Sequence, residues 1–305
     1  MSGTAGAGSS FAAVDAAEIA RLEEIARRIR VEVVKAVNHA KGGHLGGPLS
    51  AADMLAALYF RVLRIRPDEP RWPDRDRFVL SKGHSSIGLY AAMALRGYFP
   101  VEELATFDAA HSRLQGHPDM TRLPGLDMST GSLGMGISAA MGMALGARLT
   151  GRDVRAFVML GDGECQEGEV WEAAFAAARY GLENLVAIVD HNRLQQFGWR
   201  GDGPDGRVPP EAPGELVAKW TAFGWRVIEA DGHEMRDILR AFDEAAAGDG
   251  RPVVIIAHTV KGKGVSFMEN RYYWHTRILQ PDEFATAMAD LGEPLPLPAG
   301  KGGPR

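Results

Sequence analysis

A hydrophobic strand, a glycine-flanked carboxylate, a helix and a second hydrophobic strand follow one another between residues 154 and 192. Residues 154–160 and 185–189 are apolar runs of the kind found in parallel strands buried on both faces. The segment between them, Glu169–Ala178, is rich in helix-forming residues. This order predicts a βαβ unit, which commits the chain to an α/β fold with a parallel sheet.

Polar side chains stand where these two strands end. Gly161-Asp162-Gly163 follows the first strand, and Asn192 closely follows the second. Ligands of open α/β sheets bind outside the carboxyl ends of the strands, so we expect Asp162 and Asn192 to lie side by side there. Two oxygen ligands beside a glycine-lined space suit Mg²⁺, which shares its remaining positions with phosphate oxygens and water. Gly-Asp-Gly alone is a common turn, and its place between strand and helix is what favours a metal site.

The remaining periodicity predicts one doubly wound α/β domain over residues 14–293, with a mainly parallel sheet and helices on both faces. A flexible head (1–13) and a flexible tail (294–305) flank this domain. A second helix is expected to begin at Ser50, after the glycine-rich break 41–48, with Asp53 in its first turn. The other expected helices are 16–40, 86–96, one ending near Leu149, 215–223 and 234–247, and the other expected strands are 77–81, 225–229 and 252–258.

Composition excludes several classes of partner. The chain has 305 residues, of which 46% are hydrophobic, and its formal charge of −5 without a dense Lys/Arg run argues against nucleic acid. No apolar run is long enough to cross a membrane, and the first ten residues lack the basic start and apolar core of a secretory signal. Cys165 is the only cysteine, so an internal disulfide is impossible and a cytoplasmic location is expected. No feature of the sequence positions a base beside Cys165, which favours packing over nucleophilic catalysis.

Four histidines occur at the ends of predicted elements, three of them in glycine-bearing breaks: His44, His84, His117 and His275. Any single one is more often an ordinary loop histidine. Several at one sheet edge could instead bind phosphate and transfer protons near neutral pH. No paired-cysteine or H-E-x-x-H spacing indicates zinc. The order of spacings from Gly131 to Gly136 is wrong for the dinucleotide fingerprint, which disfavours a nicotinamide dehydrogenase.

Six separated motifs resemble those of the transketolase family and occur in that family's order. They are Gly42–Gly46, Leu80–His84, Gly116–Pro118, Thr130–Gly136, Gly161–Gly163 with Asn192, and Lys261–Gly264 ahead of His275. The resemblance covers roughly residues 15 to 290. It implies the thiamine-diphosphate-binding fold, and within it the diphosphate-binding (PP) domain.

The resemblance also implies roles for individual residues. Mg²⁺ would be held by Asp162, Asn192 and the backbone carbonyl of Leu194. His84 and His275 would lie beside the diphosphate and the reacting centre.

Further implied roles concern the substrate and the subunit interface. His44 and His117 would contact oxygens of the donor ketose, and Glu167 would join a glutamate relay between paired active sites. Glycines and one leucine would lie along the cofactor, namely Gly131, Leu133, Gly161 and Gly163.

A second domain of the family is expected to be supplied by another chain. In transketolases a pyrimidine-binding domain carries the glutamate that activates the cofactor and the arginines that hold the sugar phosphate. The chain stops where that domain would begin. The resemblance therefore implies the amino-terminal subunit of a split transketolase, which moves a two-carbon ketol unit from a ketose phosphate to an aldose. Its expected partner is a carboxyl-terminal, pyrimidine-binding subunit in an α₂β₂ assembly, and a cut piece of a longer enzyme is the alternative.

Three residues depart from the usual transketolase pattern. Leu45 follows His44 where many members have proline, Thr276 follows His275 where glycine is usual, and Phe197 replaces a common aspartate. These changes keep open another thiamine-diphosphate ketol transferase, resembling deoxyxylulose-phosphate synthase or serving specialised metabolism. A non-catalytic regulatory subunit is a further alternative, against which the retained Asp, Asn and His residues speak.

Overall fold

The computed structural model describes residues 15–196, 199–200, 207–208 and 214–294. The predicted head, nearly all of the predicted tail and Phe197 lie outside these described residues. No helix in the described part is long and apolar enough to cross a membrane.

Five parallel strands form the central sheet, in the order β1-β2-β3-β7-β6. A separate antiparallel pair joins β4 to β5. The strands are β1 (Arg77–Leu80), β2 (Ala156–Gly161), β3 (Leu185–His191), β4 (Trp199–Arg200), β5 (Arg207–Val208), β6 (Arg226–Asp231) and β7 (Val253–His258). The predicted βαβ unit and parallel sheet are confirmed, with the expected strand ends shifted by one or two residues.

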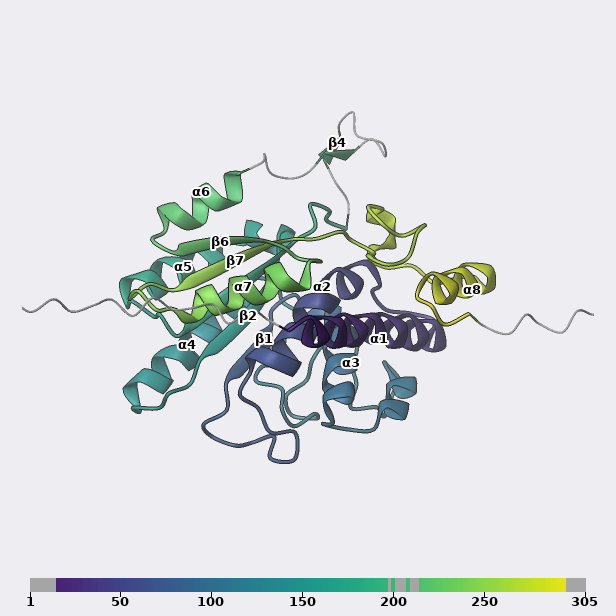
Figure 1. The fold of residues 1–305 in the computed structure, drawn as a ribbon, viewed down its shortest axis with the longest axis horizontal. Coiled ribbons are helices and arrows are strands. Elements are labelled where there is room, and N and C mark those ends of the chain that lie inside the picture. The colour runs from purple at the N-terminus through teal and green to yellow at the C-terminus, as the bar shows by residue number, and fades with distance from the viewer. Residues whose placement is uncertain (1–14, 197–198, 201–206, 209–213, 295–305) are drawn as a thin grey trace, which may run out of the picture.

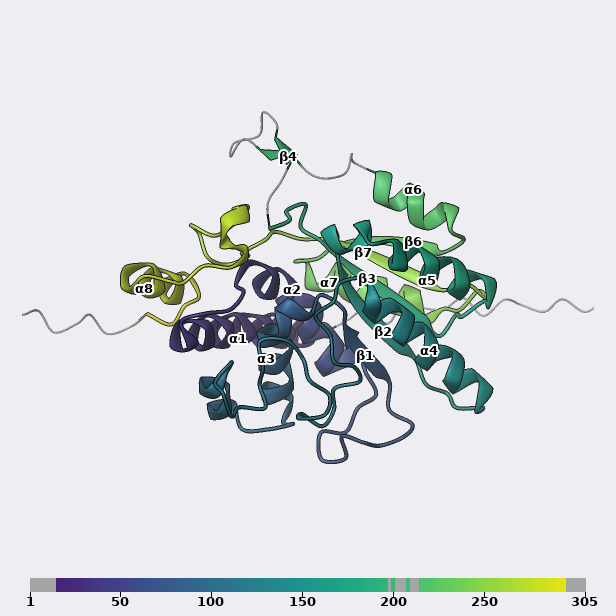
Figure 2. The ribbon, with the colours of Figure 1, turned by 180° about the vertical axis from the view of Figure 1, so that it is seen from behind.

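Helices cover both faces of this sheet, as the doubly wound prediction requires. Figure 1 shows α7 in front of the sheet with α1 and α2 beside it, and Figure 2 shows α4 and α5 on the opposite side. The α-helices are α1 (Ala16–Ala40), α2 (Gly46–Ala57), α3 (Ser86–Arg96), α4 (Met135–Leu149), α5 (Gly168–Arg179), α6 (Glu215–Ala222), α7 (Met235–Ala246) and α8 (Pro281–Asp290). Shorter turns are the π-helix Leu58–Val62 and the 3₁₀ segments Gly83–Ser85, Val101–Thr106, Gly163–Gln166 and Tyr272–His275.

Side chains of each strand alternate between two hydrophobic cores. In β2, Phe157 and Met159 belong to the core shared with α1, α2, α3 and α7, whereas Val158 and Leu160 belong to the core shared with α4, α5 and α6. This period of two follows from the pleat of the strand. Because both faces are buried, the strand reads as a continuous apolar run in the sequence.

The start of α2 was predicted wrongly. The helix begins at Gly46 instead of Ser50, so Asp53 lies beyond its first turn. Pro48 falls within that first turn, where the missing N–H leaves no intrahelical bond unmade and the fixed φ suits a helix. Ser50 caps nothing at the helix start; its hydroxyl donates to a carboxylate oxygen of Asp190 at 2.6 Å and lies 2.9 Å from the carbonyl of Gly47.

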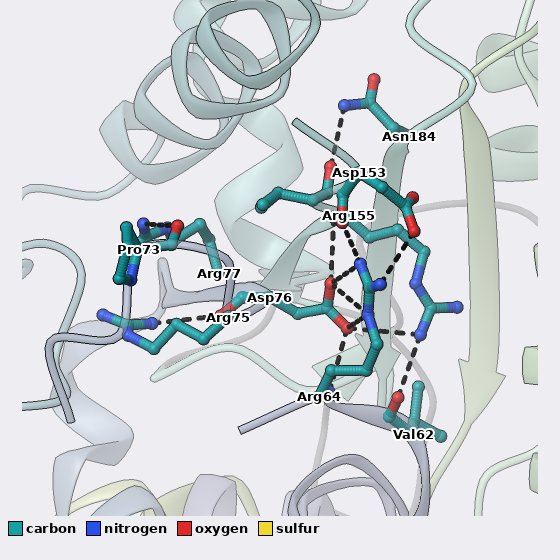
Figure 3. Close-up of polar contacts among 10 residues, drawn as sticks. Val62, Arg64, Pro73, Arg75, Asp76, Arg77, Asp153, Arg155 and Asn184 are labelled. Carbon is teal, nitrogen blue, oxygen red and sulfur yellow. Dashed lines mark hydrogen bonds and ion pairs between the residues drawn. The ribbon is translucent and has the colours of Figure 1, made fainter. Parts of the chain in front are cut away.

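A buried carboxylate holds the amino ends of β1 and β2 together (Figure 3). The side chain of Asp76 is 0% exposed and accepts hydrogen bonds from the backbone N–H groups of Arg64 and Arg155, each at 3.0 Å. The guanidinium groups of the same two arginines also reach this carboxylate, at 3.0 and 3.3 Å. The opposite, carboxyl edge of the sheet is thereby left for a ligand site.

Candidate active site

A cavity of about 450 Å³ opens at the carboxyl ends of the parallel strands. Most of the sequence-predicted site residues line it, and these are His44, His84, Gly131, Leu133, Gly161, Asp162, Gly163, Glu167, Asn192, Leu194 and His275. His117 is not among the lining residues, although its ring lies 6.4 Å from that of His44, centroid to centroid. The strand ends and glycine-rich breaks therefore gather at one site, while the individual roles predicted for these residues stay predictions.

Asp162 and the turn after β3 present oxygen atoms to the cavity. The carboxylate of Asp162 accepts hydrogen bonds from the backbone N–H groups of Gly163, at 2.7 Å, and Arg193. Burial, reinforced by the neighbouring carboxylate of Asp190, raises the pKa of Asp162 to about 6. Arg193 adopts a left-handed conformation with a φ of 65°, which turns the chain directly after Asn192.

The side-chain amide of Asn192 is oriented by two bonds. Its oxygen accepts from the N–H of Leu194 at 3.1 Å, and its nitrogen donates to Asp190 at 3.3 Å. The carboxylate of Asp162, the amide oxygen of Asn192 and the backbone carbonyl of Leu194 thus lie along this wall. This donor set suits a hard cation with few protein ligands. The described residues contain no cluster of three or more His, Cys, Asp or Glu side chains able to hold a metal ion.

The predicted histidines form a close group. The ring of His44 lies 5.0 Å from that of His84 and 5.1 Å from that of His275, and the last two rings are 5.0 Å apart. Burial, with smaller contributions from nearby histidines and lysines, lowers the pKa of His44 to about 4 and that of His275 to about 3. Burial and the ammonium of Lys82 lower the pKa of His84 even more. These three imidazoles are therefore neutral near pH 7, so each can donate one hydrogen bond and accept another.

We expect His84 to make folding depend on pH. The unfolded His84 binds a proton below about pH 6.5, whereas the folded ring stays neutral, so lowering the pH favours the unfolded chain. The contribution of the neutral His84 ring to the free energy of unfolding is complete above about pH 6.5 and is lost as the pH falls. Between pH 7.5 and 5, the difference in unfolding free energy between the wild type and His84→Asn should shift by about 1–2 kcal/mol against the wild type. Urea titrations at several pH values measure this, and parallel curves for the two proteins would contradict it.

A buried ion pair that the sequence interpretation missed lies at the cavity wall, where Lys82 is a lining residue. The ammonium of Lys82 and the hydroxyls of Ser50 and Thr259 all donate to the carboxylate of Asp190. Burial alone would raise the pKa of Asp190, but Lys82 and these hydrogen bonds hold it below its ordinary value. The side chains of Lys82 and Asp190 are almost completely buried, at 2% and 1% exposure. Lys82 follows β1 and Asp190 is the next-to-last residue of β3. A polar residue at the end of a buried strand is the same sequence signal that identified Asp162.

Lys261 connects two sides of the cavity and was also missed as a site residue. Its ammonium donates to the carbonyl of Leu194 at 2.9 Å and to Nδ1 of His275 at 3.0 Å. Because an ammonium group has no acceptor, His275 must accept at Nδ1 and carry its own hydrogen on Nε2. Burial lowers the pKa of Lys261 to about 8, which leaves it mostly charged at pH 7.

Glu164 is a further residue that the sequence interpretation missed, and its carboxylate joins three segments beside the cavity. Its carboxylate accepts from the hydroxyl of Ser81 at 2.5 Å and from the N–H groups of Gly134 at 2.9 Å and Gly161 at 3.0 Å. Burial raises the pKa of this carboxyl. Gly134, with a φ of 84°, packs so closely that an added Cβ would lie 2.7 Å from the Cβ of Glu167. Glu167 is thereby held at the rim of the cavity.

Two of the departures from the family pattern lie outside the cavity lining. Leu45 is completely buried. Thr276 is exposed, and its hydroxyl donates to the carbonyl of Gly43 at 3.2 Å. Cys165, as expected for a packing residue, is buried in the core beside α5.

The chain matches the family described as "Transketolase, thiamine diphosphate binding domain" over residues 22–295. It is 43% identical over 270 residues to the 6-deoxy-6-sulfo-D-fructose transketolase subunit of Clostridium sp. (strain MSTE9), covering 88% of this chain and 96% of that protein. It is 40% identical to one subunit of the apulose-4-phosphate transketolase of Phocaeicola vulgatus, covering 90% of this chain and 95% of that protein.

Solved transketolase structures share the fold. The transketolase of Leishmania mexicana superimposes with a TM-score of 0.81 at 32% identity, over 90% of this chain but only 41% of that one. For the Campylobacter jejuni transketolase the TM-score is 0.82 at 30% identity, and 43% of that chain is covered. The chain thus spans about two fifths of these solved enzymes and nearly the whole of the two subunits. The chain belongs to the transketolase family, and the part of the family that it represents is the thiamine-diphosphate-binding domain.

Proposed function

We propose that this chain is the cofactor-binding subunit of a two-component transketolase that transfers a two-carbon ketol unit from a ketose phosphate to an aldose. Its near-complete coverage of relatives that are themselves named subunits supports a second polypeptide that contributes the pyrimidine-binding half. An α₂β₂ assembly is the arrangement that we favour, because a shared active site and closed symmetry go together. We propose the cytoplasm as its compartment, since the single cysteine leaves the fold with no internal disulfide.

The observation that carries this proposal is the convergence of hydrogen-bonding groups on one cavity. Among the described residues, neither the buried Nε2 of Gln195, which lines the cavity, nor the buried hydroxyl of Ser85 beside Gly47 has a hydrogen-bond partner. Such groups are rare in folded proteins unless a ligand or water satisfies them. A Cβ added at Gly161 would meet no atom closer than 3.8 Å, so the protein's own packing does not demand a glycine there. These features fit a diphosphate accompanied by a divalent cation.

Thiamine diphosphate, when bound, supplies the carbanion chemistry, and the protein orients it and its substrates. We propose that Asp162, Asn192 and the Leu194 carbonyl hold Mg²⁺, with Gly161 leaving room for the diphosphate and Gly163 beside it. Gly131 and Leu133 would lie along the cofactor on the other wall.

Further residues would act on the substrate. Neutral His84 and His275 would donate to oxygens near the reacting centre, and Nε2–H of His275 is directed to do so by its bond with Lys261. His44 and His117 would contact the hydroxyls of the donor sugar. Glu167, at the rim, would join the relay between paired sites.

We expect the chain, purified from its own source under native conditions, to carry a second polypeptide and thiamine diphosphate. Native mass spectrometry with thiamine diphosphate and Mg²⁺ detects both, and a ketol-transfer assay of the complex tests the activity. A substrate panel that includes 6-deoxy-6-sulfo-D-fructose and apulose 4-phosphate beside ordinary ketose phosphates would distinguish the general transketolase from a specialised ketol transferase. A lone dimer that retains cofactor and transfers ketol units would contradict the two-component assignment. A complex that binds no cofactor would instead favour a regulatory subunit.

A further inference from the structure

A buried network outside the cavity joins α1, α2 and the loop between β6 and α7. Arg30 of α1 forms an ion pair with Asp53 of α2, and His233 of the loop contacts the same carboxylate through Nδ1 at 2.7 Å. The three side chains are only 9%, 8% and 12% exposed. None of them lines the cavity, and none belongs to the motifs that identified the site.

Both ring nitrogens of His233 are used. Its Nε2 accepts the backbone N–H of Val260 at 2.8 Å, and a backbone N–H can only donate. The hydrogen of the neutral ring must therefore be on Nδ1, where it is donated to Asp53. His233 is thus a bridge with one defined tautomer, held by the Arg30–Asp53 pair at one end and holding the main chain at the other.

The amide that His233 holds directly precedes Lys261. The side chain of Lys261 packs so tightly that a Cβ added at Gly46 would lie 2.7 Å from its Cγ, so a small shift of its backbone would move the ammonium. That ammonium contacts the Leu194 carbonyl and Nδ1 of His275. The N–H of Gly262 is separately held by the carbonyl of Gly46 at 3.0 Å. The carbonyl of Lys261 also accepts the N–H of Asn270 at 3.0 Å. Unlike these two backbone bonds, the bond at Val260 is made by a side chain and can be removed by substitution.

We propose that His233 is a positioning residue of the cofactor site: through the Val260 amide it fixes the segment that places Lys261 between Leu194 and His275. This inference rests on the proposed thiamine-diphosphate function. In this proposal the Arg30–Asp53 ion pair fixes the orientation of the His233 imidazole through the bond from Nδ1 to Asp53. The first helices of the chain are thereby coupled to the far side of the active-site cavity.

Two matched substitutions of His233 test its two hydrogen bonds one at a time. His233→Gln keeps an acceptor oxygen near the position of Nε2 and so retains the bond to Val260. His233→Asn keeps a donor near the position of Nδ1 and so retains the bond to Asp53 while releasing Val260. In the complex with its partner, we expect His233→Asn to raise the dissociation constant of thiamine diphosphate, measured by calorimetry with Mg²⁺ present, by about tenfold or more, the size typical of outer-shell supports. His233→Gln should stay within about threefold of the wild type.

Backbone amide exchange gives a readout that does not depend on activity. In the peptide that contains Val260, exchange should accelerate in His233→Asn and remain near the wild-type rate in His233→Gln, with urea midpoints confirming that both variants fold. In the wild type alone, adding thiamine diphosphate should slow exchange of this amide, because coupling between two sites is reciprocal. This last measurement needs no altered chain, and an unchanged exchange rate would overturn the coupling between Val260 and the cofactor site.

Equal cofactor affinity in the two variants, or an unchanged Val260 amide in His233→Asn, would overturn the positioning role. A wild-type complex that binds no thiamine diphosphate would overturn the proposed function, while the exchange rates would still report whether His233 holds Val260. The two failures are thus distinguishable.

Discussion

Asp162→Asn should reduce the affinity of the complex for thiamine diphosphate in the presence of Mg²⁺ by at least about 100-fold, the upper end of losses seen for outer-shell changes. The substitution replaces the only carboxylate of the proposed donor set with a neutral amide, and a hard divalent cation depends on that charge. Calorimetric titration of the cofactor at fixed Mg²⁺, with ketol transfer assayed in parallel, measures the loss.

The same substitution should leave the fold of the cofactor-free chain nearly unchanged. Asp162 is a buried carboxylate whose pKa is raised by burial and by Asp190, so it costs stability when it is ionised at pH 7. An amide removes that cost while its oxygen can still accept from Gly163 or Arg193. The matched control is Asp243→Asn on the exposed side of α7, which should change neither binding nor stability. Undiminished cofactor binding by Asp162→Asn would refute the proposed metal site.

Lys82→Met should lower the free energy of unfolding by about 3–5 kcal/mol at pH 7, because it leaves the Asp190 carboxylate buried without its cation. Guanidinium titrations followed by tryptophan fluorescence measure the change. The hydroxyls of Ser50 and Thr259 continue to donate to Asp190, but they cannot supply the lost charge.

A second substitution tests the cause of this loss. In the double variant Lys82→Met/Asp190→Asn no charge is left unpaired, so part of the stability should return, and the cycle of single and double variants gives the coupling between the two groups. A single-variant loss below about 1 kcal/mol, the range of exposed pairs, would show that the pair is not the buried support described above.

How well the sequence predicted the fold depended on whether the signal was local. The strands β2 and β3 were recognised because burial on both faces leaves an apolar run in the sequence. The end of α1 at Ala40 was predicted because Lys41 and its glycine neighbours end the helical periodicity. The start of α2 was wrong because Gly46, Gly47 and Pro48 are read as helix breakers. Only the surrounding structure shows that they form a first turn, where proline is tolerated.

The same distinction between local signals and long-range contacts applies to the candidate site. Asp162 and Asn192 could be placed together because the ends of neighbouring parallel strands share one edge of a sheet. The bonds of Glu164 to Ser81 and Gly134, and those of His233 to Asp53 and Val260, join segments far apart in the chain. No spacing of residues in the sequence predicts such contacts, because they depend on how helices, strands and loops pack against one another.

The buried Asp76 has a consequence for the order in which the molecule assembles. Its carboxylate bonds to the Arg155 amide, 79 positions along the chain, at the point where the edge strand β1 meets β2. Contacts between such distant segments form slowly, since the entropy of closing the intervening chain must be overcome first. Lys82, two residues beyond the end of β1, lines the cavity. The cavity is therefore complete only when β1 is paired with β2, so a chain in which this edge strand is undocked lacks part of the cavity wall.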